Sequence, residues 1–331
     1  MDILIAIILL GVFLFVLNQS SYLTITYALK VSDITGLART TVGFSLLAFS
    51  TSLPELSVAF VSAFTGETPI SVGNVIGSNI VNITLVVGLA ALILGFRRPH
   101  KVNVIPSFAK EELGSLYFGL FISSVIPLSL LYIVEASWLV GLILISVFVF
   151  YTYQLSKIRI PPENRNKVSE DEKKKLKRYV IFTLSGVFGV ILSSYFLVES
   201  AVVIAEFAGV PRTLIGATII AFGTSLPELS LDLRAFLKGH PSLALGDVIG
   251  SSFVNITLIL GMTLFVPALL GTPLTMNMLV FQNLVIFSLI TNLFFWYFLS
   301  MGRLSWKEGA ILLFIYILFL ATIVGAINLH P

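Results

Sequence analysis

The chain contains one segment twice. Residues 39–88 align without a gap onto residues 212–261, and 24 of the 50 paired positions are identical. The agreement is densest in the motif TSLPELS, which occurs at Thr51–Ser57 and again at Thr224–Ser230. A repeat of this kind means that one supersecondary unit is used twice, so the fold is expected to consist of two related halves.

Composition indicates that these halves lie in a membrane. Only 11% of the 331 residues are charged and 57% are hydrophobic, with a mean hydropathy of +1.01, whereas soluble domains carry about 25% charged residues. Too few charged side chains remain to cover a water-facing surface, which excludes soluble enzymes, nucleic-acid-binding proteins and disordered regulators. We therefore predict a polytopic membrane protein surrounded by the lipid bilayer, with no nucleic-acid partner.

Apolar runs of about 20 residues, the length that crosses a bilayer, predict an all-α protein with ten transmembrane helices. The predicted spans are residues 3–28, 41–64, 70–95, 113–132, 137–156, 179–207, 213–237, 242–269, 278–299 and 308–328. Lys and Arg are enriched in cytoplasmic loops. If the N-terminus lies outside, 19 of the 20 basic residues fall in cytoplasmic loops and only Arg212 lies outside. We expect an integral protein of the cell membrane with both termini outside.

Each predicted half holds five spans. Residues 1–156 form the first five-helix repeat, the charged linker 157–178 lies in the cytoplasm, and residues 179–331 form the second repeat. Because five is an odd number, the second half enters the membrane inverted relative to the first. Inverted repeats place a shared site near the bilayer midplane, on broken helices at the repeat interface. The pattern indicates a secondary transporter and not an enzyme, since no span carries a nucleophile with a base, HExxH or GxGD.

Each TSLPE motif places a glutamate in the middle of an apolar span. Pro54 and Pro227 interrupt the helix and free nearby carbonyl groups, which is tolerated at membrane depth only beside a polar cavity or inside protein. On insertion scales, an acidic side chain at the bilayer centre costs about 2.5–3.5 kcal/mol, so Glu55 and Glu228 need a cation or a proton. The Ser-x-x-Glu spacing also fits a helix capping box, which can coexist with an ion site.

A second repeated block adds neutral oxygen atoms. Ser78 and Asn82 lie four residues apart on one helix face, and Ser251 and Asn255 repeat this spacing. Packing of the small residues in this block against other helices is the alternative explanation. All of the candidate ligands are oxygen donors, which suit hard cations such as Ca²⁺ and Na⁺, and the chain has no cysteine for softer metals. The predicted cation ligands are Thr51, Ser52, Glu55, Ser78, Asn82, Thr224, Ser225, Glu228, Ser251 and Asn255.

The paired TSLPE motifs, each followed by a G-[ND]-V-I-G-S segment and an asparagine, resemble the two α-repeats of the cation/Ca²⁺ exchanger superfamily, close to its prokaryotic sodium/calcium exchanger branch. The resemblance implies the sodium/calcium exchanger fold and Na⁺-driven Ca²⁺ export by alternating access, without a cofactor or an obligate protein partner. It places the family's ion-binding positions on the ten residues above, together with main-chain carbonyls near Ala48 and Ala221. Asn255 stands where potassium-dependent members carry Asp, which argues against K⁺ cotransport.

Other functions and two further acids stay open. An H⁺/Ca²⁺ antiporter could use the same two glutamates, although that branch typically shows G-N-x-x-E in place of TSLPE, and a passive channel would couple no gradients. Asp232 is interpreted as pairing with Arg234 or Lys238, and Asp247 as hydrogen-bonded within its own helix. The alternative for both aspartates is a role in ion access or in a shifted site.

Overall fold

The computed structural model describes residues 2–35, 51–97, 110–131, 137–156, 175–237, 241–272, 277–302 and 304–328. Across these ranges the chain forms helices joined by turns and includes no strand, so the predicted all-α class is confirmed. Residues 36–50, which include the start of the repeated segment 39–88, lie outside the described residues, as does most of the linker 157–178.

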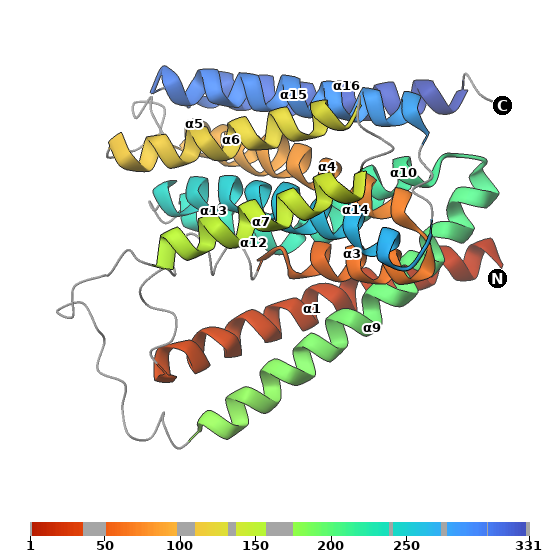
Figure 1. Ribbon diagram of the computed structural model, residues 1–331. Helices are drawn as coiled ribbons and strands as arrows, with labels where there is room; N and C mark the ends of the chain where they lie inside the picture. Colours follow the sequence, from red (N-terminus) through yellow and green to blue (C-terminus); the bar gives the residue numbers. More distant parts are fainter. Residues whose placement is uncertain are drawn as a thin grey trace.

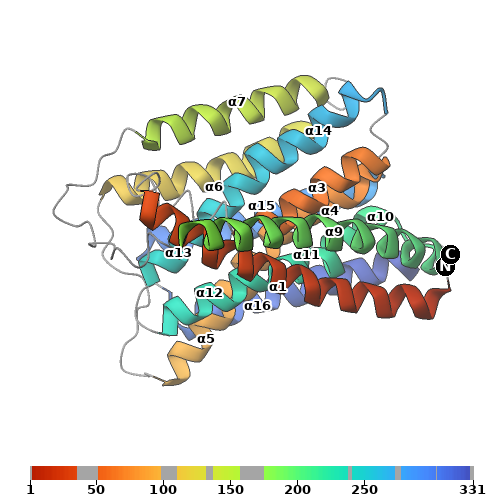
Figure 2. The same cartoon turned by 90° about the horizontal axis from the view of Figure 1, so that it is seen from below.

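Two helices of 33 residues, α1 (Ile3–Thr35) and α9 (Leu176–Ala208), lie side by side and run obliquely past the other helices (Figures 1 and 2). They approach closely, because the rings of Phe13 and Phe196 stack with their centroids 4.5 Å apart. Large apolar side chains on their outer faces are exposed, as lipid contact requires. The pair therefore forms one layer beside the rest of the bundle.

The repeated segments form the middle of the bundle (Figure 1). The first repeat supplies α3 (Leu53–Thr65), α4 (Thr68–Val81), the π-helix η1 (Asn82–Val87) and α5 (Gly88–Arg97). The second supplies α10 (Arg212–Ile215), the π-helix η3 (Gly216–Ile220), α11 (Ala221–Thr224), α12 (Leu226–Leu237), α13 (Pro241–Val254), the π-helix η4 (Asn255–Ile259) and α14 (Leu260–Leu269). The π-helices η1 and η4 begin at paired asparagines, and such segments are frequent at functional sites.

Four further helices cover this middle layer. They are α6 (Lys110–Leu130), α7 (Ser137–Ser156), α15 (Met278–Ser300) and α16 (Trp306–Asn328). Helix α7 packs on α14, α16 packs on α5, and α6 packs on both α13 and α15. The helices that carry the repeated motifs are thereby enclosed by α1 and α9 together with these four.

Small residues allow the two repeats to approach very closely. A methyl group built at Gly73 would lie 2.1 Å from the carbonyl oxygen of Thr213, and one at Gly77 would lie 2.3 Å from that of Ala217. Both distances are far inside van der Waals contact, so α4 can lie against α10 and η3 only because these positions lack a side chain. The packing explanation for these glycines is confirmed.

The number of membrane spans agrees with the sequence prediction only in part. Among the described residues, six helices are long and apolar enough to cross a bilayer, and the bent pair Arg212–Thr224 and Leu226–Leu237, with an angle of 47°, counts as a seventh. Three shorter apolar helices lie within or overlap the other three predicted spans: Tyr117–Leu130 and Trp138–Tyr153 fall inside 113–132 and 137–156, and Leu53–Thr65 covers the second half of 41–64. The ten-span inverted arrangement therefore stays a prediction.

Candidate ion-binding site

Both TSLPE motifs interrupt their helices with the same backbone geometry. Ser52 has φ −79° and ψ 9°, and Ser225 has φ −82° and ψ 5°. Helices α3 and α12 begin at the next residue, so each proline occupies the second helical position, where its missing N–H costs nothing. Glu55 and Glu228 consequently lie in the first turns of α3 and α12. The capping-box interpretation is wrong for Ser52, which makes no side-chain cap hydrogen bond.

All ten predicted ligand residues are buried. Each of them is at most 1% exposed, including the two glutamates. They come from the helix breaks of both repeats and from the partner helices α4, η1, α13 and η4. Hydroxyl, amide and carboxylate groups are therefore gathered in the interior of an apolar bundle, although burial alone does not make them ligands.

Hydroxyl groups from both repeats hold the carboxylate of Glu55. Ser78 Oγ donates to Glu55 Oε1 at 3.3 Å, and Ser225 Oγ donates to the same oxygen at 3.4 Å. Ser78 Oγ also lies 3.4 Å from Thr224 Oγ1. Four predicted residues, two from each repeat, are thus brought into one cluster.

The asparagines cross between the repeats. Asn82 Nδ2 donates to Ser251 Oγ at 3.2 Å, and Asn255 Nδ2 donates to Asn79 Oδ1 at 3.0 Å. Because both amides use a nitrogen for these bonds, their carbonyl oxygens are directed elsewhere, and neither oxygen has a hydrogen-bond partner in the described part of the chain. The sequence prediction missed Asn79, whose counterpart in the second repeat is a serine.

Several predicted ligand oxygens have no partner within the described ranges. They are Ser52 Oγ, Glu55 Oε2, both oxygens of Glu228, Asn82 Oδ1 and Asn255 Oδ1. Burying a charged carboxylate without a partner costs several kcal/mol of free energy. A bound cation or proton next to these oxygens would offset that cost.

The sequence interpretation of the two extra aspartates is wrong as far as the described residues test it. Asp232 is buried, whereas Arg234 is exposed, and the structure gives no ion pair between these two described residues. Lys238 lies outside the described residues. Asp247 faces Asp232 and Thr51 and is not bonded within its own helix.

A cavity of about 520 Å³ lies between α1 and α12. Asn18, Ser230 and Arg234 are among its polar lining residues, and it reaches Pro227, next to Glu228. Asn18 Nδ2 also donates to the carbonyl oxygen of Gly223 at 3.1 Å, which satisfies a carbonyl that the helix break frees. We call this space the α1–α12 cavity; it connects the second helix break with the outside of the bundle.

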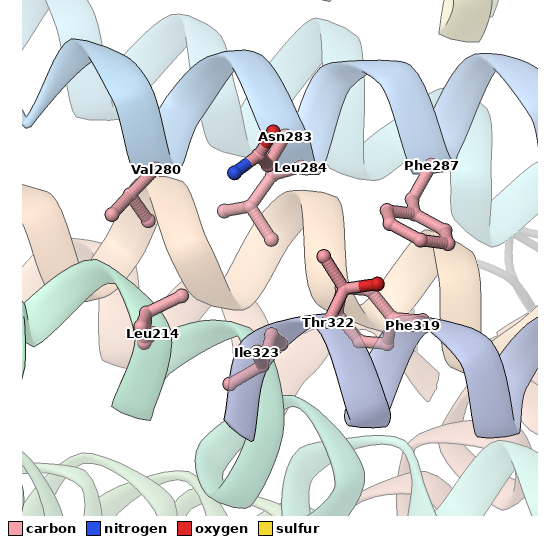
Figure 3. A pocket seen from close by; sticks show the side chains of 8 residues that line it. All are labelled: Leu214, Val280, Asn283, Leu284, Phe287, Phe319, Thr322 and Ile323. Atoms are coloured by element: carbon pink, nitrogen blue, oxygen red, sulfur yellow. The ribbon is translucent and has the colours of Figure 1, made fainter. Parts of the chain in front are cut away.

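A second, much smaller pocket has no part in the site. It lies among α10, α15 and α16, is lined mainly by apolar side chains such as Leu284 and Phe319, and contains none of the ten predicted residues (Figure 3). Its volume of about 20 Å³ has room for about one water molecule.

The fold and its buried polar centre define an integral helical membrane protein. The sequence profile of the sodium/calcium exchanger protein family matches residues 5–157 and 178–325. The chain belongs to this family, which confirms the resemblance seen in the repeated motifs. The family consists of transporters, in agreement with the expectation of a non-enzymatic function.

Individual relatives agree with this assignment. The sodium/calcium exchanger MaX1 of Methanosarcina acetivorans is 30% identical over 354 residues, covering 96% of this chain and 97% of that protein. A structure of the H⁺/Ca²⁺ exchanger CAX matches with a TM-score of 0.78 at 18% identity, over 97% of this chain and 84% of that one. The sodium-calcium exchanger NCX_Mj matches with a TM-score of 0.62 at 24% identity, over 97% and 99%. Both structural similarities show the shared fold alone.

Proposed function

We propose that the protein is a secondary antiporter that exchanges Ca²⁺ for Na⁺ at a site between the two repeats. One observation carries this proposal: two buried glutamates from opposite repeats lie among buried hydroxyl and amide groups, and several oxygens of this set lack a partner. Two carboxylates carry a charge of −2, which one Ca²⁺ neutralises. The name of MaX1, a relative over nearly the whole chain, supports the same pair of ions.

The proposed architecture has ten spans arranged as two inverted halves, residues 1–156 and 179–331, with the termini outside and the linker 157–178 in the cytoplasm. In this orientation, Arg234 and the α1–α12 cavity face the cytoplasm, which supports an inward-open state. At the opposite end, Arg212 bonds to Glu67 and Glu206, each at 2.7 Å, and joins α9 and α10 to the turn before α4. Opening one end and closing the other is the arrangement that alternating access requires.

The test is uptake of ⁴⁵Ca²⁺ into proteoliposomes that are loaded with Na⁺ and diluted into Na⁺-free buffer, with pH and voltage clamped. Uptake that depends on internal Na⁺ is the expected result. Uptake that ignores Na⁺ and follows an imposed pH gradient would assign the protein to H⁺/Ca²⁺ exchange, with Glu55 and Glu228 as the proton-carrying groups. Uptake that needs neither gradient would contradict exchange altogether and favour a channel.

A further inference from the structure

Two buried carboxylates lie outside the ten-residue set. Asp232 on α12 and Asp247 on α13 are each 1% exposed. Their carboxyl groups face each other, and the hydroxyl of Thr51 lies beside Asp247. Two acids from neighbouring helices therefore meet at the helix break of the opposite repeat.

Neither acid forms an ion pair with a basic side chain in the described part of the chain. No well-oriented hydrogen bond reaches either oxygen of Asp247 or Oδ2 of Asp232, and Arg234, the nearest described basic residue in sequence, is exposed and forms no ion pair with Asp232. Buried charges are kept only where a counter-charge or a coordinated ion offsets their desolvation. The two aspartates therefore supply the oxygen ligands of a cation site, and no basic side chain occupies the place of the cation.

The first repeat shows that packing does not require these acids. Their counterparts are Ala59 and Asn74, and both of these residues are fully buried in the corresponding place. There, Thr224 Oγ1 donates to Asn74 Oδ1 at 3.0 Å, which is the counterpart of the contact between Thr51 and Asp247. The same local packing is therefore achieved with neutral side chains in one half and with two carboxylates in the other.

The pair adjoins the ten-residue site, because Glu228 lies near enough to Glu55, Asp232 and Asp247 to interact with each of them, but it does not share one ion position with that site. The described residues include Glu55, Glu228, Asp232 and Asp247, yet no three His, Cys, Asp or Glu side chains among them are close enough to hold one metal ion. The four buried carboxylates therefore do not converge on a single ion. Thr51 links the two places, because it belongs to the ten-residue set and also lies beside Asp247.

We propose that Asp232 and Asp247, together with the Thr51 hydroxyl, form a second binding position for a hard cation of the kind the exchanger carries. This proposal rests on the exchange function proposed above. Carboxylate and hydroxyl oxygens are ligands of Na⁺ and Ca²⁺. A cation bound between two neighbouring carboxylates also offsets the repulsion between their negative charges. The second position exists in one repeat only, so it gives the α12–α13 side of the site a charge that the α3–α4 side lacks.

The decisive variant combines Asp232→Ala with Asp247→Asn, which gives the second repeat the residues that already pack in the first. The purified protein is dialysed to equilibrium against ⁴⁵Ca²⁺ and, separately, against ²²Na⁺, and bound ions per chain are counted at saturation. The variant should bind one ion fewer than the wild-type protein in at least one of the two titrations, with the affinity of the remaining ions within about threefold. Glu199→Gln, which removes an exposed carboxylate from α9, is the matched control and should leave both counts unchanged.

The opposite deletion keeps the proposal testable if the first variant does not fold. In a protein with both Glu55→Gln and Glu228→Gln, one cation should remain bound, and Asp247→Asn added to that background should remove it. Unchanged ion counts in the folded Asp232→Ala and Asp247→Asn protein, or no residual ion in the glutamine background, would overturn the second position. If the wild-type protein binds and exchanges ions but the variants do not show the expected numbers of bound ions per chain, the exchange function stands and only the second position is wrong. If the wild-type protein binds neither ion, the exchange function itself fails.

Discussion

Replacing Gly77 by alanine tests whether the site depends on the close approach of the two repeats. The new methyl group would lie 2.3 Å from the carbonyl oxygen of Ala217, and ordinary contact begins near 3.4 Å, so the helices must separate by about 1 Å (3.4 − 2.3 = 1.1). Because the methyl group meets backbone atoms, no side-chain rotation relieves the clash. We expect overpacking to lower the free energy of unfolding by about 1–3 kcal/mol. The better helix propensity of alanine offsets about 1 kcal/mol of this loss.

The effect on ion binding should be larger than this loss of stability suggests. Ser78 follows Gly77, and its Oγ lies 3.4 Å from Thr224 Oγ1 across the same interface. Metal ligands must hold their distances to within about 0.2 Å, so a shift of about 1 Å should weaken Ca²⁺ binding at least tenfold, or about 1.4 kcal/mol. Equilibrium ⁴⁵Ca²⁺ binding and thermal unfolding measure the two effects. Gly11→Ala is the control, since nothing lies within 4 Å of its new methyl group. Wild-type affinity in the folded Gly77→Ala protein would refute the reasoning.

Three further predictions follow from the site and its surroundings. Glu55→Gln and Glu228→Gln should each abolish Ca²⁺ transport in liposomes without preventing folding, because each removes half of the charge that binds the ion; full transport by both variants would contradict the assigned site. Ser230→Cys, in a chain with no other cysteine, should react with a membrane-impermeant thiol reagent in inside-out vesicles and not in right-side-out ones; the reverse pattern would invert the proposed topology. Arg212→Gln should lower the free energy of unfolding by less than about 1 kcal/mol through loss of the exposed pair with Glu206, and by more through loss of the part-buried pair with Glu67; thermal unfolding at low and high salt measures the loss, and an unchanged stability would contradict the role of the Glu67 pair.

The repeat located the two helix breaks and the buried polar residues around them because the two copies act as two independent observations of one structure. The helices were predicted to break at Pro54 and Pro227, and the breaks lie two residues earlier, at Ser52 and Ser225, which have nearly identical backbone angles. Paired asparagines were predicted to face the site, and both begin a π-helix and direct their amide nitrogens across the repeat interface. Local sequence chemistry repeated at a fixed offset was sufficient for these residues.

Residues that differ between the copies could not be predicted in this way. Asn79 accepts a hydrogen bond from Asn255, but its counterpart is a serine, so the alignment gave no signal. The contact of Arg212 with Glu67 joins residues 145 positions apart and follows from tertiary packing. Asp232 was assigned to Arg234 from proximity in sequence, although residues two apart on a helix point to different sides, and the structure buries one and exposes the other.

Only residues that differ between the repeats can make the two faces of the membrane unequal for this protein. In the proposed inverted arrangement, two identical halves would give the inward-open and outward-open states the same energy, because a two-fold rotation about an axis in the membrane plane converts one state into the other with the halves exchanged. A preference for one state therefore has to come from unpaired differences, which include Arg234 opposite Val61 and Asp247 opposite Asn74. These differences lie in α12 and α13, and α12 borders the α1–α12 cavity. In the proposed exchanger, the repeated residues hold the cation, and the residues that differ between the repeats are where the direction of access is set.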